Sequence, residues 1–174
     1  MIKKSILLAA TLLAASGAPA LAHEGGPTDP QIAHIAYTAG VIDVAAAKQA
    51  LAKSKNATVR GFANEMVRDH EAVNDQALAL VKKLGVTPQD NATSAALSAA
   101  AAAEAKKLDA LNGAAFDRAY VANEVAYHRT VNGALKQTLI PGAHNGELKS
   151  LLETGLALFG EHQSHAEHLA QTVR

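Results

Sequence analysis

Histidine and carboxylate residues interrupt stretches of the sequence in which apolar residues otherwise recur every three or four positions. Asp69 and His70 follow Met66 in one such stretch, and Glu124 and His128 are four residues apart in another. Residues four apart face the same side of a helix. Imidazoles and carboxylates are ligands for zinc, iron, manganese and copper, and helix bundles build such sites in their cores. The candidate metal ligands are Asp43, Asp69, His70, Glu124, His128 and His162.

Helix geometry predicts that these six residues meet. Counted from a turn near residue 55, Asp43 and His70 lie ~12 and ~15 residues away, which is within roughly 5 Å along the bundle axis. Counted from a second turn near residue 142, the three candidates that follow residue 120 lie ~14 to ~20 residues away, again within two helical turns. We therefore expect one polar belt across the middle of the bundle.

The sequence leaves two interpretations of this belt open. In the first, the three histidines bind a divalent transition metal, assisted by the neighbouring acids. In the second, His70 hydrogen-bonds Asp43 or Glu124, and the belt only fixes the register of the helices. The spacing departs from the di-iron pattern, in which two helices each carry Glu-x-x-His, so a standard di-iron oxidase is not expected.

A second group of histidines lies near the C-terminus. His162, His165 and His168 recur every three residues, so they cannot all face the core from one helix. We expect one of them to be buried and the other two to be exposed to solvent.

Apolar spacing, helix caps and helix breakers predict an all-α protein without strands. The first helix is expected over about 30–54, with Asp29 as its N-cap. The second is expected from a cap at Asn56 to Leu84, where Gly85 ends it. Both helices carry an apolar stripe, as helices of a bundle do.

The second half of the chain adds two long helices and one short one. The segment 95–107 is rich in alanine but has few large apolar side chains, so it is expected as a crossover helix outside the main bundle. A long helix is expected from Phe116 to about Leu139, before Pro141, and another from a cap at Asn145 almost to Arg174. The expected fold is an up-down four-helix bundle with a short extra crossover helix.

The N-terminal segment has the pattern of a secretory signal peptide. Lys3 and Lys4 precede a short apolar run, and small residues at Ala20 and Ala22 end it. The run is shorter than the ~20 residues that a membrane-spanning helix needs. We therefore expect residues 1–22 to be a signal peptide, residues 23–28 a flexible lead-in and residues 29–174 the bundle domain. Export to the periplasm or cell envelope, with no membrane span, follows from this expectation.

The composition argues against several other classes of protein. The chain has no cysteine, so it forms no disulfide or thiolate metal site and has no lipid-modified N-terminal cysteine. Its net charge is zero, which is unlike the basic surface of a nucleic-acid-binding protein. We find no nucleophile constellation and no phosphate-binding loop, so no organic cofactor is indicated. An enzyme is not the favoured interpretation, and a metal-dependent oxidation is the one reaction that stays conceivable.

Several of these residues together resemble a known family. The segment Val59–His70, the run of residues 113–120, and then His128 and His162 are similar to domain-of-unknown-function family 4142. The resemblance covers residues 29–169. It implies an exported bacterial protein of ferritin-like fold, from a group often labelled predicted outer membrane protein, with no established activity. Where that family pattern has Glu in the first helix, this chain has Asp43.

Two functions are therefore predicted as alternatives. In the first, the protein is an exported bundle that binds a transition metal in order to store, buffer or sense it. In the second, it is a non-catalytic envelope protein, active in stress tolerance or in interactions, whose polar belt only holds the helices in place.

Overall fold

The computed structural model describes residues 26–173, which are almost entirely helical and contain no strand. The predicted signal peptide and residues 23–25 of the predicted lead-in lie outside this range. Among the described residues, none of the helices is apolar enough over a sufficient length to cross a membrane. The elements are α1 (Asp29–Lys53), α2 (Ala57–Leu84), α3 (Ala92–Asp109), α4 (Gly113–Ala134), the π-helix η1 (Leu135–Leu139), α5 (Ile140–Gly142) and α6 (Gly146–Thr172).

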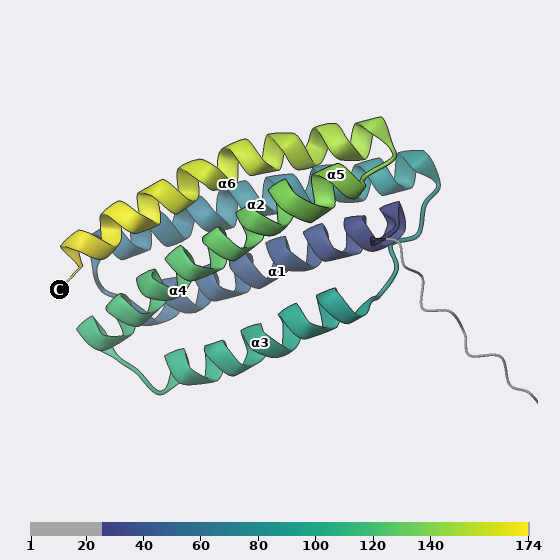
Figure 1. The fold of residues 1–174 in the computed structure, drawn as a ribbon. Coiled ribbons are helices and arrows are strands. Elements are labelled where there is room, and N and C mark those ends of the chain that lie inside the picture. Colours follow the sequence, from purple (N-terminus) through teal and green to yellow (C-terminus); the bar gives the residue numbers. More distant parts are fainter. Residues whose placement is uncertain (1–25, 174) are drawn as a thin grey trace, which may run out of the picture.

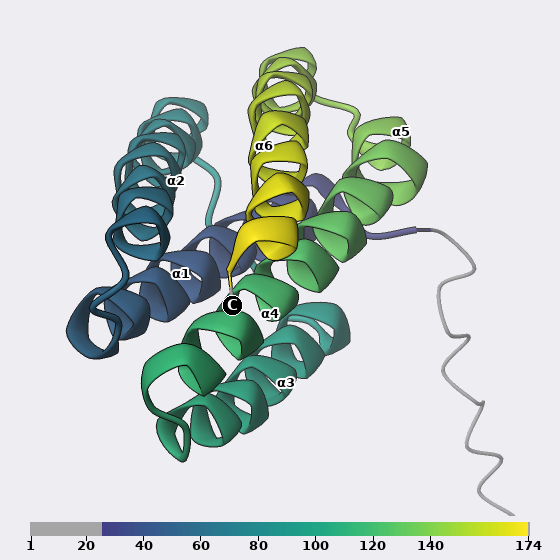
Figure 2. The ribbon, with the colours of Figure 1, turned by 90° about the vertical axis from the view of Figure 1, so that its left-hand side faces the viewer.

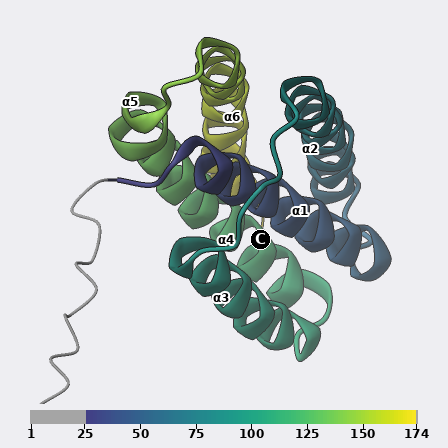
Figure 3. The same ribbon diagram turned by 90° about the vertical axis from the view of Figure 1, so that its right-hand side faces the viewer.

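Four long helices form the bundle, and α3 lies outside it. Helix α1 packs chiefly on α2, and α4 packs chiefly on α6. Figures 2 and 3 show α2 and α6 in one layer and α1 and α4 in a second layer, with α3 against the outer side of the second layer. The predicted all-α class and the crossover helix are confirmed.

The connections set the directions of the helices. Short turns join α1 to α2 and α4 to α6, so each of these pairs is antiparallel, as expected. Helix α3 runs back along the bundle, and α4 therefore begins at the same end as α2 and runs parallel to it (Figure 1). This arrangement is consistent with the ferritin-like fold that the family resemblance implies.

The predicted helix caps are confirmed at two positions and wrong at one. Asn56 and Asn145 each accept hydrogen bonds from backbone N–H groups of the first turn that follows. Asp29 is not the N-cap of α1, because Thr28 holds that place and Asp29 lies in the first turn. The Asp29 carboxylate is occupied elsewhere: it accepts hydrogen bonds from the backbone N–H groups of His144 and Asn145, both at 2.8 Å. It thereby ties the start of α1 to the start of α6.

The continuous helical segment formed by α4, η1 and α5 extends a little further than predicted. It was expected to end near Leu139, yet η1 and α5 continue it to Gly142, with Pro141 inside the last turn. A proline ring disturbs the carbonyl four residues before it and has no N–H to donate. The five residues before Ile140 accordingly take the wider π-helical form.

The apolar core is divided into two clusters by the middle of the bundle. One cluster surrounds Phe62, Met66 and Phe116 near the turn between α1 and α2. The other surrounds Ile32 and Leu152 near the opposite end. The buried side chains of the polar belt, Asp43, His70, Glu124, His128 and His162, lie between these clusters, so each apolar cluster covers one side of the belt.

Candidate metal centre

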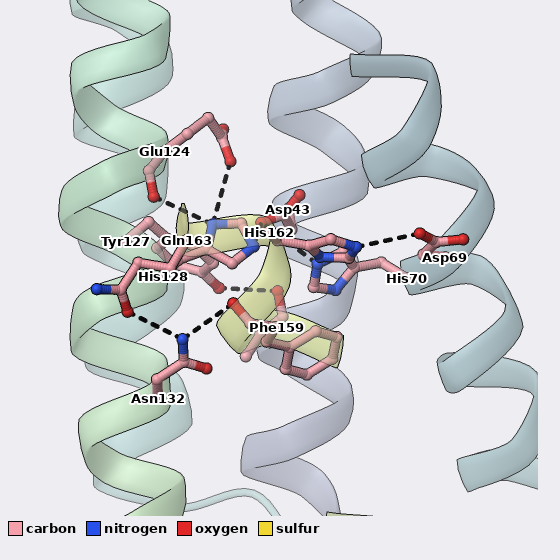
Figure 4. Close-up of polar contacts among 11 residues, drawn as sticks. Asp43, Asp69, His70, Glu124, Tyr127, His128, Asn132, Phe159, His162 and Gln163 are labelled. Atoms are coloured by element: carbon pink, nitrogen blue, oxygen red, sulfur yellow. Dashed lines mark hydrogen bonds and ion pairs between the residues drawn. The ribbon is translucent and has the colours of Figure 1, made fainter. Parts of the chain in front are cut away.

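Three histidines from three helices converge in the middle of the bundle. His70 belongs to α2, His128 to α4 and His162 to α6, and all three side chains are buried. One ring nitrogen of each lies within 4.8 Å of a ring nitrogen of the other two. Figure 4 shows the three rings facing one another between the helices. The structure therefore brings together the histidines that the sequence predicts to meet.

The orientation of the His128 ring is fixed by its own helix. Its Nδ1 atom lies 3.0 Å from the backbone carbonyl oxygen of Glu124, so Nδ1–H donates to that oxygen. The other nitrogen, Nε2, then carries the free lone pair. This atom is buried without a hydrogen-bond partner, 3.6 Å from Oδ2 of Asp43.

His162 is oriented by a carboxylate from another helix. Its Nε2 atom lies 3.1 Å from Oδ2 of Asp69, which leaves Nδ1 as the nitrogen with a free lone pair. That Nδ1 atom is buried and has no partner. Asp69 is itself held by Arg68 through two hydrogen bonds of 2.6 and 2.9 Å, and this guanidinium keeps the pKa of Asp69 below its usual value.

His70 has no hydrogen bond at all. Both of its ring nitrogens are buried without a partner, and Nε2 lies 3.7 Å from Oδ2 of Asp43, beyond hydrogen-bonding distance. Its ring stacks on Phe159, with the ring centroids 4.4 Å apart and the planes 8° from parallel. In the described part of the chain, His70 therefore forms neither of the hydrogen bonds, to Asp43 or to Glu124, that the sequence offers as one interpretation of the belt.

Two carboxylates complete the belt. Asp43 of α1 and Glu124 of α4 are both fully buried, and none of their four oxygens has a hydrogen-bond partner. One oxygen of each and one nitrogen of His128 lie within 4.8 Å of one another. The shorter side chain of Asp43 therefore still reaches the cluster from the first helix.

Burial favours the neutral forms of these groups. It raises the pKa of Asp43 to about 7, and burial together with the charge of Asp43 raises the pKa of Glu124 well above its usual value. Burial also lowers the pKa of His70 to about 3 and that of His128 to about 4. Near neutral pH the histidines are thus uncharged and have free lone pairs, which is the form that binds a metal.

Comparison with known proteins assigns the chain to a family. The family model DUF4142, a domain of unknown function, matches residues 12–169. The chain belongs to the DUF4142 family. No curated protein and no solved structure matches it. The function of this DUF4142 domain therefore has to be argued from its site, because a fold alone does not determine one.

The polar belt of the DUF4142 domain is flanked by a cavity and a cleft. An apolar cavity of about 360 Å³ reaches His70 and His128 from the end of the bundle where η1 lies. A larger cleft of about 600 Å³ between α1, α3 and α4 reaches Asp43 and Glu124 from the other side. The cavity is therefore bordered by histidines of the belt, and the cleft by its two buried acids.

One acidic residue beside the cluster was missed from the sequence. Glu65 has a carboxylate oxygen within 4.8 Å of ligand atoms of Asp69 and His162, and it also lies 2.9 Å from Nδ1 of His165. The signal was present, because Glu65 and Asp69 are four residues apart on one helix. The two remaining histidines of the C-terminal group, His165 and His168, are exposed, as expected.

Proposed function

We propose that this DUF4142 domain binds one divalent transition-metal ion in the middle of its bundle. The observation that supports the proposal most strongly is a set of buried lone pairs without partners. They belong to His70, His128 and His162 and to both oxygens of Asp43. Each buried polar atom that lacks a partner costs about 1–3 kcal/mol, and a cation bound here would satisfy one nitrogen of each histidine and an oxygen of Asp43.

The chemistry of this set suits a transition metal. Three neutral imidazoles and one carboxylate are four ligands of the type that zinc accepts in tetrahedral sites, and iron, copper and manganese use the same groups. The free nitrogens are Nε2 of His128 and Nδ1 of His162, while His70 has both nitrogens free. Each of the bundle helices α1, α2, α4 and α6 contributes one ligand, so a bound ion would join all four.

In this proposal two further groups accept hydrogen bonds from the histidine ligands and do not bind the ion themselves. The Asp69 carboxylate accepts from His162, and the Glu124 carbonyl oxygen accepts from His128. Metal-binding histidines commonly donate their second N–H to a carboxylate or a backbone carbonyl, which fixes the tautomer and strengthens the ligand. Asp69 therefore orients a ligand and does not itself bind the ion.

We infer that the domain stores, buffers or senses the ion in the periplasm or cell envelope. The location follows from the signal-peptide pattern of residues 1–22. The sensing role is supported by the ligand set, because an ion that links four helices changes how firmly they pack. No reaction is assigned to the site.

Thermal unfolding with and without metal tests this proposal. Protein purified without a tag is treated with chelator and then melted alone and with Zn²⁺, Mn²⁺, Cu²⁺ or Fe²⁺. At least one of these ions should raise the melting temperature, and the rise should be lost in H70A and H162A but kept in H168A, which removes an exposed histidine of the same helix as His162. If no ion raises the melting temperature of the wild type, the proposal is wrong.

A further inference from the structure

One buried acid of the polar belt, Glu124, is not among the proposed metal ligands. The Glu124 side chain is fully buried, and neither of its carboxylate oxygens has a hydrogen-bond partner. The nearer oxygen lies 3.5 Å from Nδ1 of His128, the nitrogen that already donates to the Glu124 carbonyl. Its carboxylate therefore lies nearest the His128 nitrogen that is not proposed to bind the ion. An uncompensated buried acid of this kind is costly to keep.

Glu124 and Asp43 both border the cleft between α1, α3 and α4. The cleft has a volume of about 600 Å³, and much of its wall is alanine, including Ala45 and Ala46 of α1 and Ala101 of α3. One water takes about 30 Å³ of liquid volume, so a cation that keeps part of its hydration shell fits inside. Asp43 and Glu124 are the ionisable groups at the buried side of this cleft, and Glu104 lies on its α3 side.

We propose that Asp43 and Glu124 form a second cation position, here called the outer position, which takes up a hydrated divalent cation from the cleft and passes it to the three histidines. This inference rests on the proposed function, because it describes how the same ion reaches its site. Carboxylate oxygens and retained water are the ligands that a hydrated divalent cation prefers on arrival. Asp43 belongs to both positions, since its Oδ2 lies 3.6 Å from His128 and 3.7 Å from His70.

The other two approaches to the histidines are less suited to a cation. At the outer edge of His162, Asp69 is paired with Arg68 and Glu65 with His165, so both carboxylates are occupied and a guanidinium lies beside them. On the opposite side, the cavity of about 360 Å³ is lined mainly by Leu, Val, Ile and Ala side chains. A hydrated cation would lose water there without gaining ligands.

The outer position also accounts for the composition of α3. This helix buries only Ser94 and Leu108 and has alanine at most other positions. Hydrogen bonds from Gln49 and Lys53 to Asp109 help to hold its C-terminal end against α1. Larger side chains on the inner face of α3 would fill the cleft and close the approach to the acids.

The rate of metal uptake tests the route. Chelator-treated full-length protein is mixed with Zn²⁺, and the free ion is followed with a fluorescent zinc indicator. E124Q, which keeps the size of the side chain, and A101F, which narrows the cleft, should both take up Zn²⁺ severalfold more slowly than the wild type and reach the same final stoichiometry. A99F adds the same ring at an exposed alanine of α3 that does not line the cleft, and it should load at the wild-type rate. Uptake of Zn²⁺ by E124Q and A101F at the wild-type rate would overturn the inference and leave the proposed function intact.

Binding of Mn²⁺ tests the outer position itself. In H162A the three-histidine set is incomplete, but Asp43 and Glu124 remain, so weak Mn²⁺ binding should persist and be visible as loss of the electron paramagnetic resonance signal of the free ion. The double variant H162A/E124Q should lose this binding. Equal Mn²⁺ binding by the two variants would show that Glu124 holds no cation. A wild type that binds neither Zn²⁺ nor Mn²⁺ would instead refute the proposed function.

Discussion

The Nε2 atom of His162 on α6 lies 3.1 Å from Oδ2 of Asp69 on α2. Because this carboxylate accepts the Nε2 proton, the buried Nδ1 atom is left with its lone pair free and without a partner. Asp69 is only slightly exposed and is held in turn by Arg68. The contact therefore fixes both the tautomer and the direction of one imidazole in the cluster.

Loss of this carboxylate should weaken metal binding without abolishing it. In D69N the amide can still face His162 but no longer carries the charge that strengthens the imidazole, so we expect affinity to fall by about 10–100-fold at unchanged stoichiometry. Calorimetric titration of chelator-treated protein measures both quantities. D75N, an exposed acid on the same helix, is the matched control and should bind as the wild type does. Complete loss of binding in D69N would mean that Asp69 is itself a ligand.

His70 should make the metal-free protein less stable than an apolar residue would. Both of its ring nitrogens are buried and unpaired, and such a group costs about 1–3 kcal/mol. We expect H70L to unfold at a higher urea concentration than the wild type in the presence of chelator, with a gain of about 1 kcal/mol. In the presence of metal the order should reverse, because H70L lacks a ligand. A large loss of stability in H70L under chelator would favour a structural role for His70.

Metal affinity should depend on pH through the buried carboxyl groups. Burial raises the pKa of Asp43 to about 7, so a bound ion must displace a proton below that pH. His70 and His128 have pKa values lowered to about 3 and about 4, so they stay neutral and do not compete over this range. Affinity should therefore rise with pH by about tenfold per unit below pH 7 and more slowly above it. Titrations at several pH values check this slope, and a flat profile between pH 5 and about 7 would exclude Asp43 from the site.

The packing of α1 against α2 beside the cluster should tolerate no side chain at Gly40. A Cβ atom there would lie 2.2 Å from Oδ1 of Asn74, which is buried. We expect G40A to lose about 1–3 kcal/mol of stability, because overpacking displaces the amide. G61A has open space around its Cβ and removes a helical glycine, so it should gain about 0.5–1 kcal/mol. Chemical denaturation of the two variants gives this comparison, and equal stability would show that Asn74 moves aside freely.

Much of the site was predictable because helices impose regular geometry. The rise per residue and the two short turns were sufficient to predict that Asp43 and His70 lie at nearly one level. They also predicted that Glu124, His128 and His162 lie within two helical turns of one another. Those turns depend on the caps at Asn56 and Asn145, which short-range sequence patterns identify.

The features that were not predictable depend on side-chain direction. The spacing of Asp69 does not reveal that its carboxylate accepts a hydrogen bond from Nε2 of His162. The misassigned cap at Asp29 has a similar cause, because its carboxylate binds backbone N–H groups more than a hundred residues away in the sequence. The cleft beneath α3 likewise depends on how closely an alanine-rich helix packs on its neighbours.

The most direct test of the central claim is the metal content of protein saturated with Zn²⁺ and then freed of excess ion, measured by elemental analysis. The wild type should retain one ion per chain, H70L and H162A should retain clearly less, and H168A should match the wild type. Retention of no ion by the wild type, or of the same amount by all four proteins, would contradict the assignment of a metal site to the three buried histidines and Asp43.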